Sequence, residues 1–319
     1  MKTRFPRLGA PSLLALATIL LTASWTSPQA PPHAGAEKPA AGAEAESLAG
    51  AATVAVSDPV ITAAGDIALQ STTGHHKATS DRVLAINPTI ALTLGDNQYP
   101  SGALADFRRY YDPTWGRFKA KTKPSPGNHE YYTAGAAGYF GYFGTAAKPA
   151  GKSYYSFNLG GWHLIALDSN IARSVGAAQE RWLRADLAAT SRRCILAYWH
   201  HPRFSSGTHY GNNASVGPFW TDLYNARADV VLNGHEHNYE RFARQTPSAT
   251  ATAAGIREFV VGTGGGGLYG LGTPKPNSQA RNSKTWGVLK LTLHPASYEW
   301  RFVAASGAVI DSGGPVTCH

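Results

Sequence analysis

Continuous apolar runs recur along the chain, and polar residues directly follow each of them. The runs occupy 60–64, 89–94, 194–199 and 228–232. Runs of this length, rich in Val, Ile, Leu and Ala, predict strands that are buried on both faces. The polar residues would then lie on loops at the carboxyl ends of these strands, along the edge of a central sheet where α/β proteins usually place their sites.

Segments with helical spacing alternate with these strands. We expect helices at 79–86, 103–111, 176–189 and 216–227, with Ser80 or Asp81 capping the first. The runs 154–157 and 162–167 flank Gly160-Gly161 and predict a hairpin. After residue 257 the pattern indicates a β-meander, with strands at 258–261, 286–293, 298–303 and 309–310. The alternation predicts an α/β fold of mixed α+β character, with a pair of mixed sheets and outer helices.

The first residues differ in character from the rest. Lys2, Arg4 and Arg7 precede an apolar stretch at 8–21, which predicts a secretory signal peptide over 1–30 and a secreted protein. An N-terminal membrane anchor helix is the alternative. Residues 31–56 are mostly Ala, Pro, Gly and Glu and predict a disordered linker, which leaves one large domain at 57–319. No later segment has enough consecutive apolar residues to span a bilayer.

Charge and cysteine content limit the classes of partner that the chain can have and the states that its cysteines can adopt. The chain has 29 Lys and Arg against 20 Asp and Glu, a formal charge of +9. A basic protein favours anionic substrates or surfaces, but the lack of basic runs argues against dedicated nucleic-acid binding. The two cysteines are Cys194 and Cys318. An even number in an oxidising compartment favours a disulfide, and two buried free thiols are the alternative.

Five polar blocks carry the candidate chemistry. They are Gly65-Asp66, 95–99 (GDNQY), 127–130 (GNHE), 200–202 (HHP) and 234–237 (GHEH). Carboxylate, amide oxygen and imidazole are ligands for a pair of metal ions, which can hold a phosphate ester and supply hydroxide to attack it. The glycines allow the backbone to turn sharply at a strand end, so that these side chains can converge.

Taken in order, the blocks resemble the signature of the calcineurin-like metallophosphoesterases. The segment 234–241 (GHEHNYER) is similar to the purple acid phosphatase branch, here as a secreted bacterial type. The resemblance implies a four-layer αββα sandwich of two mixed β-sheets flanked by helices. It also implies two metal ions, iron together with zinc, manganese or a second iron. The ligands it implies are Asp66, Tyr99 and His237 for the first ion, Asn128, His200 and His235 for the second, and Asp96 bridging both.

One departure from the wider superfamily supports this branch. Many relatives have Asp-x-His in the first block, with that His as a metal ligand, whereas this chain has Ala68 at the position. The purple branch supplies a Tyr instead, in Gly-Asp-x-x-Tyr, which corresponds to Tyr99. A phenolate there would favour a trivalent ion. The alternative is that Tyr99 packs beside the site and water completes the coordination of the metal.

The resemblance also assigns roles around the metal pair. His129 and His209 match catalytic and substrate-contacting histidines, although His209 could also be a solvated loop residue. His201 is expected to contact substrate or to support the ligands. His75-His76 could line the cleft or lead into a helix. The glycine-rich segment 262–267 has no helix behind it, so we reject a nucleotide-cofactor site and expect a flexible loop bordering the cleft.

The implied function is acid phosphatase-like hydrolysis of phosphate monoesters, by attack of metal-activated hydroxide on phosphorus, with small phosphorylated molecules as substrates. A phosphodiesterase acting on nucleotides or phospholipid headgroups is the alternative among enzymes, because the same metal pair serves both reactions. A catalytically idle binding protein is a further alternative from a different class. It is less favoured, since every ligand position of the family is filled.

Overall fold

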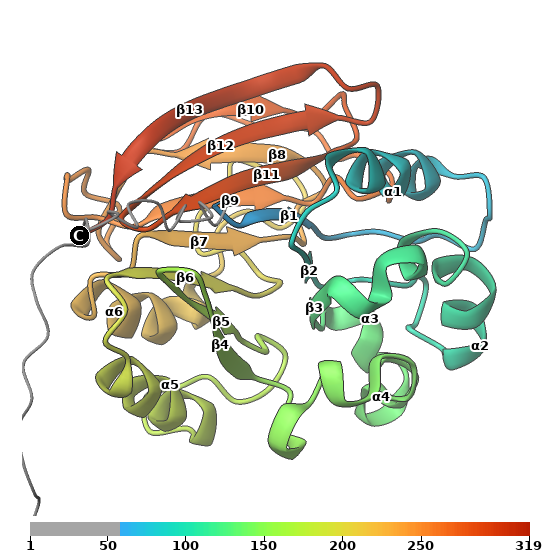
Figure 1. Cartoon of the computed structure of the whole chain (residues 1–319), viewed down its shortest axis with the longest axis horizontal. Helices are drawn as coiled ribbons and strands as arrows, with labels where there is room; N and C mark the ends of the chain where they lie inside the picture. Colours follow the sequence, from blue (N-terminus) through green and yellow to red (C-terminus); the bar gives the residue numbers. More distant parts are fainter. Residues whose placement is uncertain (1–57) are drawn as a thin grey trace, which may run out of the picture. The chain divides into compact units, whose positions relative to one another are not determined.

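The computed structural model describes residues 58–319, and its strands form two mixed sheets packed face to face (Figure 1). The six-stranded sheet has the order β13-β12-β11-β1-β2-β3, and the seven-stranded sheet the order β10-β8-β9-β7-β6-β5-β4. The predicted signal peptide and linker, over 1–56, lie outside the described residues. Within 58–319 no helix is long and apolar enough to cross a membrane.

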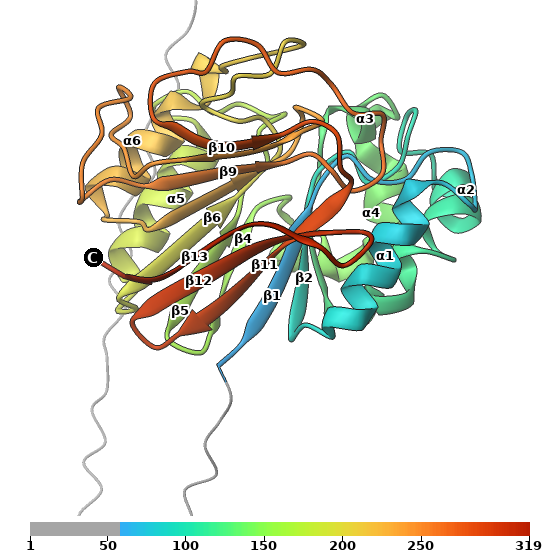
Figure 2. The ribbon, with the colours of Figure 1, turned by 90° about the horizontal axis from the view of Figure 1, so that it is seen from above.

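The first sheet combines an N-terminal parallel half with a C-terminal antiparallel half, as Figure 2 shows from above. Its strands are β1 (Val60–Ala64), β2 (Ile90–Leu94), β3 (Thr122–Ser125), β11 (Gly287–His294), β12 (Ser297–Ala304) and β13 (Val309–Thr317). The helices that accompany it are α1 (His75–Ile86), α2 (Leu104–Asp106), a π-helical turn (Phe107–Tyr111) and a 3₁₀ segment (Trp115–Lys121). α1 joins β1 to β2 and contacts β11 and β12.

The second sheet has parallel strands at its centre and antiparallel strands on either side. Its strands are β4 (Tyr155–Leu159), β5 (Trp162–Ala166), β6 (Cys194–Tyr198), β7 (Val230–Asn233), β8 (Tyr239–Phe242), β9 (Arg257–Val261) and β10 (Ser278–Asn282). The remaining α-helices are α3 (Asn128–Tyr131), α4 (Ala137–Phe143), α5 (Ala178–Ala189) and α6 (Gly217–Asn225).

Alternate side chains of the central strand β6 separate the two cores of the domain. Leu196 and Tyr198 belong to the larger apolar cluster, which joins both sheets. Ile195 and Ala197 point to the other face and pack in a second cluster with Leu183 and other residues of α5 and α6. Side chains of successive strand residues point to opposite faces. A continuous apolar run is therefore what a strand covered on both faces requires.

The four-layer α/β arrangement and the hairpin are confirmed, whereas several boundaries were wrong. α1 begins at His75 after Gly74, not near residue 79. Ser80 caps nothing and instead donates a hydrogen bond to the Thr114 carbonyl. His75 and His76 open the helix, and the buried His76 ring bonds the Ser71 carbonyl oxygen. The meander strands are longer than predicted at the C-terminus, where β13 runs over nine residues with mostly exposed side chains.

The predicted disulfide between Cys194 and Cys318 is present, with a Cα–Cα distance of 5.4 Å. Both cysteines are buried. Cys194 is the first residue of β6 in one sheet, and Cys318 directly follows β13 in the other. The bond therefore ties the two sheets together as well as fixing the C-terminal segment.

The glycine-rich loop 262–267 borders the site, as expected, but its backbone is held along its length. The amide groups of Gly262, Gly264 and Gly266 donate to the carbonyl oxygens of Asn238, Gly65 and Asp66 at 3.0, 2.9 and 2.8 Å. A Cβ on Gly264 would lie 2.5 Å from the Gly65 oxygen, so only glycine permits this approach. The loop is thus a backbone-bonded wall of the site, and the prediction of a flexible loop was wrong in this respect.

Two carboxylates meet where α5 packs on α6, and they make stability depend on pH. Burial, together with the charge of Glu180, raises the pKa of Asp222 to about 6, from an ordinary value of 3.8. The folded chain then holds this proton more tightly than the unfolded chain does, so stability falls as pH rises through that interval. We expect Asp222→Asn to be more stable than the wild type at about pH 7.5, by a few tenths to about 1 kcal/mol after solvent screening.

Urea unfolding at about pH 7.5 and about pH 4 measures this effect, and the gain should shrink at the lower pH. Asp81→Asn is the matched control, because hydrogen bonds from Lys77 and Arg117 lower the pKa of Asp81. That control should show no gain at the higher pH. Equal gains for Asp222→Asn at both pH values would contradict the assignment.

Candidate metal centre

All five polar blocks meet at one edge of the two sheets. Asp66 follows β1, Asp96 follows β2, and Asn128 follows β3, all parallel strands of the first sheet. His200 follows β6 and His235 follows β7, parallel strands of the second sheet. Because carboxyl ends of parallel strands share an edge, the blocks converge although they lie far apart in the sequence.

One group of ligand atoms surrounds the Tyr99 hydroxyl. Its oxygen lies 3.1 Å from Asp66 Oδ1, 3.2 Å from Asp96 Oδ2 and 2.9 Å from His237 Nε2. His237 Nε2 is also 3.2 Å from Asp66 Oδ1. This group is the one predicted for the first metal ion.

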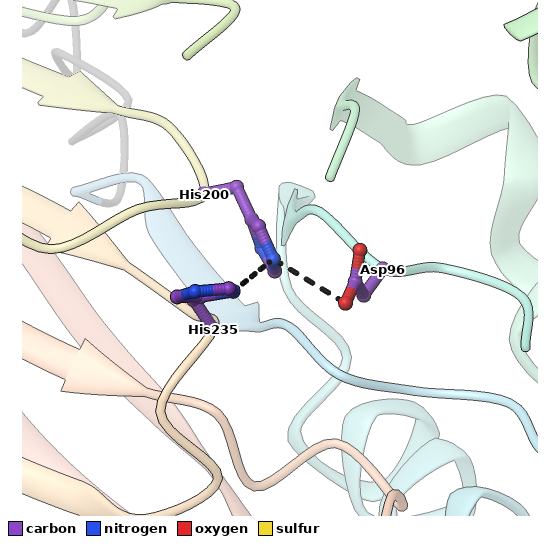
Figure 3. A group of neighbouring side chains, drawn as sticks. All are labelled: Asp96, His200 and His235. Carbon is purple, nitrogen blue, oxygen red and sulfur yellow. Dashed lines mark hydrogen bonds and ion pairs between the residues drawn. The ribbon is translucent and has the colours of Figure 1, made fainter. Parts of the chain in front are cut away.

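A second group surrounds His200 Nε2. This nitrogen lies 3.3 Å from Asp96 Oδ2, 3.1 Å from Asn128 Oδ1 and 3.1 Å from His235 Nδ1. Figure 3 shows Asp96, His200 and His235 directed toward one another. Asp96 Oδ2 belongs to both groups, which is the position predicted for the bridging carboxylate.

The donor set fits metal ions of the first transition row. Imidazole nitrogen together with carboxylate and amide oxygen suits such ions, and the donor atoms of each group lie within 3.3 Å of a shared atom. The outer nitrogens of two imidazoles are already occupied: His200 Nδ1 bonds the Leu94 carbonyl oxygen at 2.8 Å, and His237 Nδ1 bonds that of Gly267. Such bonds fix the ring and leave Nε2 to face the ion.

The backbone at the ligands has unusual conformations. Asp66, Asp96 and His235 have φ of 60°, 48° and 70°, in the left-handed region that residues with a Cβ rarely adopt. Such strain persists where the surroundings impose it, and it is often found at functional sites. Gly127 permits the same convergence, because a Cβ there would lie 2.1 Å from Asp96 Oδ1.

The acids and imidazoles of the site form one electrostatic network. Burial alone would raise the pKa of Asp96, but the charge and hydrogen bond of His200 hold it well below its usual range. Burial likewise opposes the charge on His200, yet Asp96 raises the pKa of His200 to about 9. Burial and the charge of His200 lower the pKa of His235. Binding of a cation at His200 Nε2 would require that this nitrogen carry no proton.

The three predicted substrate histidines differ in position. His129 donates its backbone N–H to Asp96 Oδ1 at 2.9 Å, and its Nε2 lies 3.8 Å from Asp96 Oδ2. The His201 ring lies 4.3 Å from the His235 ring, and its Nδ1 is 2.7 Å from Ser169 Oγ. Both therefore adjoin the ligands.

His209 is farther from the ligands. Its exposed ring lies 4.5 Å from the rings of Tyr210 and Tyr269, measured between centroids. Among the interactions of residues 58–319, its ring forms no hydrogen bond with a predicted ligand. The structure thus brings His209 to the rim of the site and not into the ligand groups.

Sequence reasoning missed a buried carboxylate that shapes the site. Glu130 accepts hydrogen bonds from the backbone N–H groups of Asn97, Gln98 and Gly127, at 2.8, 3.2 and 2.6 Å. Burial, with the charge of Asp96, raises the pKa of Glu130 to about 7. Glu130 is the last residue of the GNHE block, so its place in that block was the sequence signal that could have indicated its role. Glu130 joins the second and third blocks and positions Asp96 between them.

Two tyrosines that sequence reasoning also missed lie against metal-ligand candidates. The Tyr210 ring stacks on His235 at 3.8 Å, and the Tyr269 ring stacks on His237 at 3.9 Å. Neither belongs to a recognisable block, and no sequence spacing indicated their positions. Each ring covers one face of the imidazole on which it stacks.

Comparison with known proteins gives this geometry a family. The calcineurin-like phosphoesterase family is matched over residues 59–239. Purple acid phosphatase 15 of Arabidopsis thaliana is 30% identical over 241 residues, which cover 64% of this chain and 44% of that protein. Purple acid phosphatase 23 of the same plant is 30% identical over 238 residues, covering 63% of this chain and 51% of that protein. The chain spans about half the length of these curated relatives.

Solved structures share the fold at lower identity. The purple acid phosphatase PPD1 of yellow lupin superposes with a TM-score of 0.64 at 19% identity, covering 80% of this chain and 53% of that one. GAP50, the anchor in the inner membrane complex of Plasmodium, superposes with a TM-score of 0.62 at 15% identity, covering 82% and 90%. From its sequence blocks, its paired mixed sheets and its family match, this chain belongs to the calcineurin-like phosphoesterase family, with purple acid phosphatases among its relatives.

Proposed function

We propose that this protein is a secreted phosphomonoesterase that works with two metal ions. Asp66, Asp96, Tyr99 and His237 would hold the first ion, and Asp96, Asn128, His200 and His235 the second. The observation that carries the proposal is the convergence of both groups on Asp96 Oδ2, at 3.2 Å from Tyr99 and 3.3 Å from His200. The disulfide agrees with an oxidising compartment and hence with export.

When bound, the two ions would activate water as the nucleophile and neutralise charge on the phosphate. The residues around them have complementary tasks. Asp96 would be a ligand of both ions. Glu130, through three backbone N–H groups, holds the loops that carry Asp96 and Asn128. This arrangement keeps the ligands in place before substrate arrives.

The histidines around the ligands would bind the phosphate and assist departure of the alcohol. Burial is the largest cause that lowers the pKa of His201, so this ring is neutral. Ser169 Oγ accepts a hydrogen bond from the His201 backbone N–H at 3.2 Å. The Ser169 hydroxyl can therefore donate its own hydrogen bond to His201 Nδ1. The ring proton then lies on Nε2, where it can donate to a phosphate oxygen. His209, exposed at the rim, can supply a proton to the departing alkoxide.

The direct test combines metal analysis with paired ester assays. Protein purified without added metal should contain about two ions per chain by mass spectrometry of the metals. It should hydrolyse nitrophenyl phosphate faster than bis-nitrophenyl phosphate. A faster diester reaction would favour a phosphodiesterase, which the same donor set could serve. Absence of turnover across a wide pH range in fully loaded protein would point to a binding role on the same fold.

Tyr99 offers a spectroscopic prediction for the first ion. Burial and the charges of Asp66 and Asp96 raise the pKa of Tyr99 well above its usual value, so only a bound cation would favour the phenolate. We expect oxidised, iron-loaded protein to be violet to pink through phenolate-to-iron charge transfer. Tyr99→Phe keeps the ring and removes the oxygen, so the visible band should vanish while the fold remains.

The matched control for this experiment is Tyr139→Phe. Tyr139 is fully buried, and within residues 58–319 its hydroxyl has no hydrogen-bond partner. That variant should keep its colour. Colourless wild-type protein with ferric iron established in the first site would show that Tyr99 packs beside the ion without binding it.

A further inference from the structure

Exposed aromatic rings gather at the metal centre. Among the Phe, Tyr and Trp rings of residues 58–319, only Tyr132 and Tyr210 are exposed, at 64% and 47%. The remaining aromatic rings of that region are buried or half-buried. Leaving a large apolar ring in water forgoes the free energy of burial, so two such rings beside one site call for an explanation.

Both rings flank the position predicted for the second metal ion. Tyr210 lies nearly parallel to His235, with centroids 3.8 Å apart and an interplanar angle of 22°. The Tyr132 ring lies 4.7 Å from His129, and its hydroxyl accepts a hydrogen bond from Asn128 Nδ2 at 3.2 Å. One tyrosine therefore adjoins the imidazole ligand and the other adjoins the amide ligand. A phosphate held between these ligands would place its ester group at the two rings.

The aromatic surface continues from Tyr210 toward the ligands predicted for the first ion. Tyr269 stacks on His237 with centroids 3.9 Å apart and an angle of 7°. His209 lies 4.5 Å from the rings of both Tyr210 and Tyr269. Tyr132, His209, Tyr210 and Tyr269 together form what we call the aromatic rim.

Buried carboxylates hold the loop that carries His209 and Tyr210 of this rim. Glu236, between His235 and His237, accepts the backbone N–H of Tyr210 at 2.6 Å and also that of Gly211. Glu240 on β8 accepts the N–H of Ser206 at 2.7 Å. Glu258 on β9 accepts the N–H of Arg203 at 2.9 Å in the same way.

These bonds fix the loop 203–211 before any substrate binds. Little conformational entropy would then be lost when a ring packs against Tyr210. The Tyr210 side chain is thus fixed at its base, covers His235 with one face and leaves nearly half of its surface to solvent. That is the arrangement expected of a stacking platform.

We infer that the aromatic rim selects phosphate monoesters whose alcohol carries a planar aromatic or heterocyclic ring. The inference rests on the proposed function and adds a substrate class to it. Tyr132 and Tyr210 are the specificity-determining residues, because they adjoin the ligands and are exposed. Stacking of a substrate ring on a tyrosine strengthens binding by about three- to tenfold for a single pair.

The test compares two esters whose alcohols have similar acidity, 2-phenylethyl phosphate and n-butyl phosphate. Metal-loaded wild type should show a higher kcat/KM for the phenylethyl ester. Tyr210→Ala and Tyr132→Ala should each lower the ratio of the two kcat/KM values about three- to tenfold. Tyr210→Phe should retain the ratio, because it keeps the ring. Leu84→Ala removes an exposed apolar side chain from α1, 43% exposed, and should leave both values unchanged.

A binding measurement separates this inference from the proposed function. Calorimetric titration with phenylphosphonate and butylphosphonate requires no turnover, and metal content is measured for each variant. A preference for phenylphosphonate that is lost in both alanine variants supports the inference, even if neither ester is hydrolysed. Hydrolysis of both esters with no preference for the ring, in kinetics or in binding, would overturn the inference and leave the proposed function intact. Equal losses for both ligands in the variants would also overturn it.

Discussion

If the proposed function holds, Asp96→Ala should lose both metal ions and at least about a thousandfold in the rate of phosphate ester hydrolysis. Asp96 Oδ2 is the one atom shared by the two ligand groups, 3.2 Å from the Tyr99 oxygen and 3.3 Å from His200 Nε2. Without this carboxylate, two cations would repel each other across a buried site with no anion between them. The second group would also be left with neutral ligands alone, Asn128, His200 and His235.

The second ligand group provides the contrast for this experiment. His235→Ala removes a ligand of one ion only, so it should empty the second site and keep the first. Asp81→Ala is the control for loss of a carboxylate, because Asp81 lies exposed on α1 and pairs with Lys77 and Arg117. Metal content by mass spectrometry and kcat/KM on a monoester measure all three variants. Two metal equivalents retained by Asp96→Ala would rule out its bridging role.

Loss of the Cys194–Cys318 disulfide should destabilise the fold by up to about 5 kcal/mol. The bond joins residues separated by 124 positions, and closing a loop of that length removes much entropy from the unfolded chain. Most of that free energy should appear in urea unfolding of the Cys194→Ala, Cys318→Ala double variant. The oxidised wild type and the reduced wild type serve as references.

A separate measurement detects a disulfide that has formed in only some of the molecules. Peptide mass mapping of protein from an oxidising compartment should find the two cysteines linked and no free thiol. Equal unfolding free energies for the oxidised and reduced wild type would show that the bond contributes nothing to stability. The metal content should be held constant in these measurements, because bound ions stabilise the folded state by mass action.

Local physics made the strands of the central sheets predictable. Runs such as 89–94 and 194–199 place apolar side chains on both faces of the element. A strand or helix needs apolar side chains on both faces only where the protein covers both faces. The candidate ligands were predictable for the same reason, because polar residues at the ends of buried strands must meet at one edge. The glycines beside them marked the turns. The family resemblance added the assignment of each ligand to one of the two ions, which the residue types alone did not determine.

Elements whose structure depends on distant neighbours were not predictable. β3 contains Lys123 and Pro124, which argue against a strand, yet β3 lies at the edge of its sheet, where proline is tolerated. The start of α1 was missed because its first turn is polar, although His76 is buried by later parts of the chain. The aromatic rim belongs to three separate loops, so its composition could appear only in three dimensions.

The two sheets are joined at opposite ends of the domain. Cys194 begins β6 and is bonded to Cys318, which follows β13 of the other sheet, whereas His200 lies beyond the carboxyl end of β6 and faces Asp96 of the other sheet. Bound metal at one end and the disulfide at the other would both resist sliding of one sheet over the other. Reduction and chelation should therefore act non-additively on unfolding, with the combined loss exceeding the sum of the separate losses. Once the disulfide is reduced, the affinity for metal would then also depend on how firmly the two sheets are packed against each other.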